Sequence, residues 1–195
     1  PPFHRAVLVP RWPPPYLCGM DRMLLTAMGL ALLSTAVTAP VQAETRAARG
    51  RTATPPRLIG KYDDWQAVTH AEAGQTVCYA FTRASSSVPT LPGRGDVVLT
   101  VTHRPGIRDN VAVSAGYAFP ATAEMQLAVE GTVLPFYTAN RSAFARDGHA
   151  ATAVFARGRQ AVARAPGPRG AMVTDTFPLR GFGPAYAAIN RACPK

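Results

Sequence analysis

Serine and histidine residues that could carry catalysis or bind a metal do not have the spacing that known mechanisms need. Ser114 lies in Ala112–Gly116, which lacks the first glycine of a Gly-x-Ser-x-Gly elbow and falls in a predicted strand. His70, His103 and His149 are widely scattered, and none has a ligand partner at i+2 or i+4. We therefore expect surface or strand-end histidines, no catalytic serine and no metal site.

Carboxylates are the other candidates for acid and base chemistry. Nothing in their spacing selects a pair, although folding could bring two of them together. The two cysteines that follow residue 43 do not form Cys-x-x-Cys, and no glycine-rich loop with lysine could bind a phosphate. We predict a protein that is not an enzyme and has no cofactor, with a hydrolase as the alternative. The available carboxylates are Asp63, Asp64, Asp96, Asp109 and Asp175.

The tripeptide Arg94-Gly95-Asp96 has the composition of an integrin-binding loop. The surrounding Pro92–Asp96 is also what a turn before a strand needs, because its glycines allow positive φ and its aspartate makes local hydrogen bonds. We expect the turn rather than adhesion.

Residues 20–43 are typical of a secretory signal. Met20 and Arg22 precede the apolar run 24–33, and Val41-Gln42-Ala43 places small residues at a cleavage site. The run is shorter than the roughly 20 residues that span a bilayer, which argues against an uncleaved anchor. We expect a cleaved signal peptide that starts at Met20 rather than Met23.

Export sets the expected domain organisation. We expect residues 1–19 to be a miscalled upstream extension, 20–43 the signal peptide, 44–60 a flexible N-terminal arm and 61–195 one β-rich domain. The 152 residues after Ala43 suffice for one hydrophobic core. They would contain no transmembrane span and no lipid anchor, since Cys18 precedes the apolar run.

Cys78 and Cys193 are the two cysteines left after cleavage. An even pair in an oxidising compartment predicts a disulfide, and two separate buried thiols are the alternative.

Positive charge dominates the exported chain. Three arginines and one aspartate precede Glu44, which leaves 18 basic and 10 acidic residues and a net charge of +8. Arginines crowd the C-terminal half, where a shared face would attract lipid head groups, lipopolysaccharide or another acidic partner, and a solvated face is the alternative. Nucleic acid is not expected, because no binding motif supports it. The candidate anion-binding surface is Arg157, Arg159, Arg164, Arg169, Arg180 and Arg191, with Arg141 and Arg146 nearby in the sequence.

Short runs with alternating faces follow Gly60 and predict half-buried strands. In the run 97–103, Val97, Leu99 and Val101 share one face. Glu130-Gly131 predicts a tight hairpin. We expect a mainly β fold, an antiparallel sandwich or a barrel-like domain. The predicted strands are 65–70, 77–82, 97–103, 111–117, 125–129, 133–137, 160–164 and 172–177.

Two short helices complete the prediction. Asp147 can cap a helix over 149–157 that stops at Gly158. A C-terminal helix would have Gly183 at its cap and Pro184 at its first position, and would point Cys193 toward the core with Tyr186 and Ile189.

An ordered series of short motifs runs through the domain. It consists of Asp64-Trp65, Val77–Ala80, Arg94–Asp96, Thr102–Pro105, Asn110–Pro120, Thr174–Phe182 and Ala187–Cys193. In this order the motifs resemble the invasion-associated locus B family of alphaproteobacterial exported proteins. Two departures are Asp63 where the usual Gly-Asp-Trp has glycine, and no cysteine soon after Trp65.

The resemblance implies a small, mainly β protein in the periplasm or at the outer membrane, named for a role in invading host cells. It carries over no catalytic residue. We therefore expect an exported envelope protein that binds an anionic envelope component or another envelope protein. A periplasmic hydrolase and a structural envelope scaffold are the alternatives.

Overall fold

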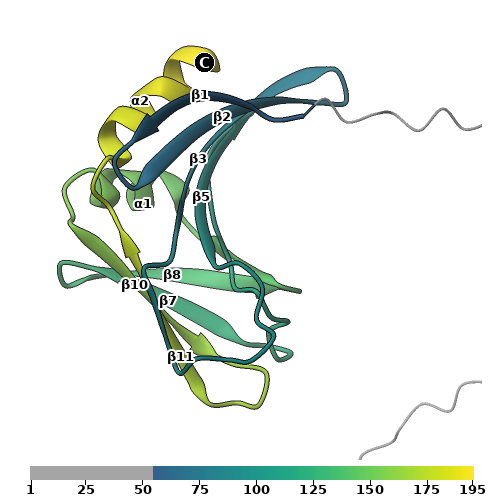
Figure 1. Ribbon diagram of the computed structural model, residues 1–195, viewed down its shortest axis with the longest axis vertical. Helices are drawn as coiled ribbons and strands as arrows, with labels where there is room; N and C mark the ends of the chain where they lie inside the picture. The colour runs from purple at the N-terminus through teal and green to yellow at the C-terminus, as the bar shows by residue number, and fades with distance from the viewer. Residues whose placement is uncertain (1–54) are drawn as a thin grey trace, which may run out of the picture. The chain divides into compact units, whose positions relative to one another are not determined.

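The computed structural model describes residues 55–195 (Figure 1). The expected upstream extension, the signal peptide and residues 44–54 of the expected arm lie outside the described residues.

Eleven strands form a single antiparallel sheet, in the order β1-β2-β3-β5-β6-β9-β8-β7-β10-β11-β4. Along the chain they are β1 (Arg57–Tyr62), β2 (Trp65–Glu72), β3 (Gln75–Arg83), β4 (Ser86–Val88), β5 (Val98–Arg104), β6 (Ile107–Ser114), β7 (Glu124–Val129), β8 (Thr132–Ala139), β9 (Ser142–Ala145), β10 (Gln160–Pro166) and β11 (Met172–Pro178). The prediction of a mainly β fold with a C-terminal helix is confirmed.

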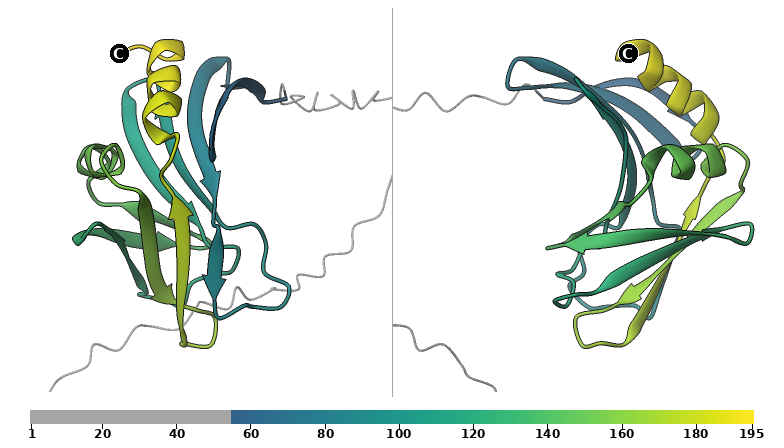
Figure 2. Two further views of the ribbon diagram at one scale, coloured as in Figure 1. Left: turned by 60° about the vertical axis from the view of Figure 1, so that its left-hand side comes forward. Right: turned by 180° about the vertical axis from the view of Figure 1, so that it is seen from behind.

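The chain passes from one half of the sheet to the other between β3 and β4. The strand β3 pairs with β2 and β5, whereas β4 pairs with β11. At the crossing, the Ala84 amide donates to the Val97 carbonyl, and the Ser85 amide donates to the Thr176 carbonyl at 2.8 Å. The sheet therefore curves around its own inner face, with β1, β2, β3 and β5 on one side and β7, β8, β10 and β11 on the other, and it is not closed (Figures 1 and 2).

Buried side chains at alternate positions of the strands fill the space between the two halves of the sheet. In β5, Leu99, Val101 and His103 are fully buried, while the intervening threonines are only half-buried. Trp65 at the start of β2 is also fully buried, and its indole donates a hydrogen bond to the Pro178 carbonyl at 3.0 Å. Each large apolar side chain buried in this way contributes about 1.5–3 kcal/mol.

The hairpin between β7 and β8 turns at the predicted dipeptide. Glu130 and Gly131 have φ of 45° and 86°, as a type I′ turn requires at its two central residues.

The helix α1 (Gly148–Phe155) has the predicted cap. The Asp147 side chain accepts a hydrogen bond from the Ala150 amide at 2.9 Å. The helix ends two residues before the expected Arg157. Gly158 is required for packing, since a Cβ there would lie 2.2 Å from Val129 Cγ1.

The helix α2 (Phe182–Ala192) begins earlier than expected, because its cap is Gly181 and not Gly183. Gly181 has φ of 88°, and a Cβ there would lie 1.9 Å from the Tyr62 carbonyl oxygen. Only glycine fits both conditions. Pro184 is then the third helical residue, where its missing N–H costs no intrahelical bond.

Three short strands were not predicted, namely β1, β4 and β9. Residues 57–60, expected in the flexible arm, belong to β1 and pair with β2, so the boundary at residue 61 falls within a strand. The helix α2 packs across β1, β2 and β3, which stabilises β1, and α1 packs against β6 (Figure 2). Neither helix in residues 55–195 has the length and apolar character needed to span a membrane.

Candidate functional site

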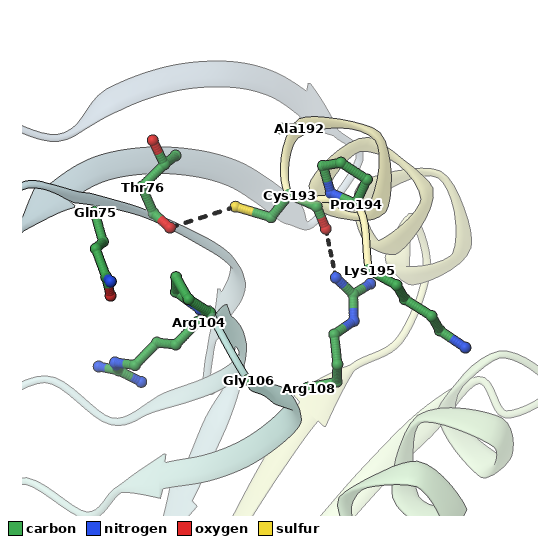
Figure 3. Close-up of a pocket in the computed structure, with 10 residues that line it drawn as sticks. Gln75, Thr76, Arg104, Gly106, Arg108, Ala192, Cys193, Pro194 and Lys195 are labelled. Carbon is green, nitrogen blue, oxygen red and sulfur yellow. Dashed lines mark hydrogen bonds between the residues drawn. The ribbon is translucent and has the colours of Figure 1, made fainter.

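A cavity of about 770 Å³ lies where the β2–β3 turn, the β5–β6 turn and the end of α2 meet (Figure 3). This volume is within the range of ligand pockets in proteins. The lining residues are Gln75, Thr76, Arg104, Pro105, Gly106, Arg108, Ala192, Cys193, Pro194 and Lys195.

Three of the lining side chains are cationic, and none of the lining side chains is acidic. Arg104 and Arg108 flank the β5–β6 turn, and Lys195 follows α2. Figure 3 shows Arg104 on the side of Gln75 and Arg108 reaching toward Cys193. Arg104 also donates to Glu72 at 3.1 Å, an exposed pair that solvent screens. The cavity therefore favours an anion.

Arg108 holds the end of α2. Its guanidinium donates to the Cys193 carbonyl oxygen and to Asn190 Oδ1. Both acceptors are neutral, so these contacts satisfy the helix end without cancelling the charge of Arg108.

The predicted disulfide between Cys78 and Cys193 is present, with a Cα–Cα distance of 6.0 Å. It joins β3 to the residue that ends α2. The disulfide and Arg108 thus fix the same end of α2. Arg108 and Cys193 are also lining residues of the cavity.

His103 is fully buried on β5, directly opposite Cys78 in the strand pairing. Its Nδ1 accepts a hydrogen bond from the Asp109 amide at 3.2 Å, while Nε2 has no hydrogen-bond partner among residues 55–195. Burial, with the charge of Arg108 as a second cause, lowers the pKa of His103 from its ordinary value. Of the two expected positions, the surface is wrong for this histidine because it is fully buried, whereas the strand end is right because His103 is the last residue but one of β5.

Asp109 connects the β5–β6 hairpin to both helices. Oδ1 accepts from the Tyr186 hydroxyl of α2 at 2.6 Å, and Oδ2 lies 3.3 Å from Nδ1 of His149 in α1. Burial, followed by the hydrogen bond to Asp109, raises the pKa of Tyr186. Gly148 allows the start of α1 to lie this close to Asp109, since a Cβ at residue 148 would overlap the Asp109 carbonyl oxygen. His103 and His149 therefore both contact Asp109, His103 through the backbone amide and His149 through the carboxylate.

The arginines expected to form an anion-binding surface lie at separate places. Arg157, Arg159 and Arg180 are at the end of the β10–β11 hairpin next to the helices, where the Leu179 amide donates to the Arg159 carbonyl. Arg159 lies 3.5 Å from Glu130, and Arg180 lies 3.7 and 3.5 Å from Asp63 and Asp64. Arg164 is in the middle of β10, Arg169 is in the turn at the far end, and Arg191 is on α2.

The carboxylates considered for catalysis pair with other side chains, and Asp63 and Asp64 share one partner. Asp63 and Asp64 face Arg180, and Asp96 faces Arg83. Asp109 joins the helices, and Asp175 binds Arg94. Among residues 55–195, no three His, Cys, Asp or Glu side chains come together as a metal site would require.

The tripeptide Arg94-Gly95-Asp96 is not displayed as a unit. The Arg94 side chain is 6% exposed and paired with Asp175, whereas the Asp96 side chain is 72% exposed. Ser114 is exposed at the end of β6.

Arg104, Arg108 and Lys195 were missed as a group by reasoning from sequence. Two arginines on either side of Pro105-Gly106 were a local signal, because a tight turn places its flanking residues near each other. The third cation comes from a segment about 90 residues away, which only the fold brings near.

The family model described as "Invasion associated locus B (IalB) protein" matches residues 65–190. Searches among curated proteins and among solved structures gave no match.

Proposed function

The chain belongs to the invasion associated locus B family, and from that premise we propose that it is an exported cell-envelope protein that binds an anionic envelope component. The cavity of Figure 3 carries the proposal, since Arg104, Arg108 and Lys195 line it without an acidic side chain. A net charge of +8 after residue 43 would add a long-range attraction to the same ligand.

Export to the periplasm or the outer membrane is part of the proposal. The apolar segment within residues 20–43 supports it. The Cys78–Cys193 disulfide supports it too, because structural disulfides persist in oxidising compartments. A role in invading host cells follows the family's description and would depend on the protein reaching the outer surface.

Binding to acidic vesicles and to lipopolysaccharide tests the proposal. We expect the exported protein to co-sediment with phosphatidylglycerol vesicles at low salt, and the affinity to fall as salt screens the attraction. The double variant Arg104→Ala/Lys195→Ala should lose roughly tenfold in affinity, which corresponds to about 1.4 kcal/mol.

Arg83→Ala is the matched control. It removes an arginine whose side chain is more exposed than that of Arg104, 60% against 39%, at the opposite end of β3 from Gln75 and Thr76. This variant should bind within twofold of the wild type. Absence of binding to both probes, or an equal loss in the control, would refute the proposal.

A hydrolase is the second candidate, because Asp109 contacts both His149 and Tyr186. Hydrolysis of ester or amide substrates that Asp109→Asn abolishes and Asp96→Asn leaves unchanged would favour it. A structural scaffold would instead be recognised by a defined oligomer in gel filtration.

A further inference from the structure

A second cavity, of about 470 Å³, lies between the loop that follows β4 and the β10–β11 turn. Gln75 and Thr76, at the start of β3, line the first cavity. The lining of the second cavity begins at Pro89, just after β4. The two therefore lie at opposite ends of the path formed by β3 and β4 (Figure 1).

The walls of the second cavity are mainly apolar. Leu91 and Val173 pack with Tyr117 in a small hydrophobic cluster, separate from the main core. Pro89, Pro92 and Pro168 add ring carbons and fix the backbone φ of both loops. The three prolines limit the conformations open to these loops before a ligand arrives, which lowers the entropic cost of binding.

Arg94 forms part of the wall but offers little to a ligand. It makes two hydrogen bonds to Asp175, at 2.8 and 2.7 Å, and donates Nε to the Ala115 carbonyl at 2.7 Å. Its guanidinium also lies 5.0 Å from the centre of the Tyr117 ring. The charge of Arg94 is therefore neutralised, and one face of Tyr117 is occupied.

Arg169 is the cation left for a ligand at this cavity. It is exposed in the β10–β11 turn, and it forms no ion pair with any residue from 55 to 195. No acidic side chain is among the lining residues. The ligand should therefore combine an apolar body with an anionic end.

An aliphatic body fits better than a planar ring. Tyr117 is the aromatic side chain of the lining; Arg94 lies over it and Phe119 packs edge-on at 5.2 Å. The walls consequently present CH groups rather than a free ring face for stacking.

We propose that this cavity binds the hydrocarbon chain of a fatty acid, with Arg169 holding the carboxylate. The proposal does not depend on the anion-binding role of the first cavity, which shares no lining residue with it.

The test titrates the full exported chain with decanoate below its micelle concentration and follows backbone amides by NMR. We expect saturable shifts in residues 89–94 and 167–173. Nonyltrimethylammonium, with the same nine-carbon chain and the opposite charge, should bind at least tenfold more weakly.

Two variants localise the binding. Ala171→Trp places a large ring in the cavity from an exposed position and should abolish the shifts. Arg169→Ala should lower the affinity for decanoate roughly tenfold, because one charge-assisted contact is lost. Arg159→Ala, in the same hairpin at its other end and 90% exposed, should leave the affinity unchanged.

Equal affinity for the two head groups would overturn the proposal, as would decanoate binding that survives Ala171→Trp. Absence of shifts at millimolar decanoate would overturn it as well.

Discussion

Arg94 and Asp175, which lie 81 residues apart in the chain, form a bidentate ion pair whose side chains are only 6% and 7% exposed. Ser87 adds a hydrogen bond to the same carboxylate at 2.7 Å. The pair attaches the loop before β5 to β11 and so connects the two halves of the sheet. It also explains why Arg94 serves the fold rather than an adhesive tripeptide.

Asp175→Asn should destabilise the protein by about 3 kcal/mol, because it leaves the Arg94 charge buried without its counter-ion. Urea denaturation measures the change. Asp96→Asn is the control in the same region, and its exposed pair with Arg83 should cost less than about 0.5 kcal/mol. Similar losses in the two variants would contradict the assignment of a structural role to the buried pair.

Removal of the disulfide should have an effect of similar size. The loop that it closes has a sequence separation of 115 residues, and the chain-entropy relation gives about 4–5 kcal/mol for such a loop. The double variant Cys78→Ser/Cys193→Ser should unfold at correspondingly lower urea. The stability of this variant should not respond to a reductant, whereas the wild type should approach it when reduced. A wild type that ignores the reductant would show that the bond is not formed.

We predict that burial of His103 makes the folded protein less stable in mild acid. Its pKa is lowered in the native state, so the unfolded chain binds a proton first as pH falls below its ordinary value of about 6.5. The stabilising contribution is complete above that pH and is lost progressively down to the lowered native pKa. The groups that face the ring are Arg108, Asp109, Tyr186 and Asn190.

Comparison with His103→Gln isolates this effect from other titrations. We expect the difference in unfolding free energy between wild type and variant to shrink as pH falls from 7.5 to 5. A constant difference over that interval would exclude the titration of His103 as its source.

Gly181 should respond to alanine far more strongly than Gly183. Gly181→Ala forces a side chain into left-handed backbone and against the Tyr62 carbonyl, which should cost at least about 1–2 kcal/mol. Gly183→Ala lies inside α2, and no atom beyond its chain neighbours and the backbone of its own helix lies within 4 Å of its Cβ. The helix propensity that alanine gains there is opposed by Pro184, which disfavours helical backbone at the residue before it, so the change in stability should stay within about 0.5 kcal/mol. Thermal unfolding distinguishes the two, and a Gly183→Ala variant that is destabilised as much as Gly181→Ala would place the cap where the sequence suggested.

Local sequence was sufficient for much of the fold. Alternation in β5, the Glu130-Gly131 turn and the Asp147 cap are decided by neighbouring residues, and each was predicted. The disulfide could also be predicted, because only one pairing is available to the two cysteines that follow residue 43.

The strand β1 could not be predicted in this way. Its residues have no clear alternation of their own, and they are ordered by pairing with β2 and by packing beneath α2. Gly181 became the helix cap for a similar reason, since the Tyr62 carbonyl that excludes a side chain comes from the other end of the domain.

By itself the sequence determined the fold class, the family resemblance and the cysteine pairing, because each depends on local patterns or on simple counting. The tertiary structure alone decided which charges are free. It placed Arg164, Arg169 and Arg191 away from the other three candidate arginines, buried Arg94 against Asp175 and brought Arg104, Arg108 and Lys195 to one cavity. Charge neutralisation depends on distances of a few ångströms between residues far apart in the chain, and those distances are set by strand order and helix packing.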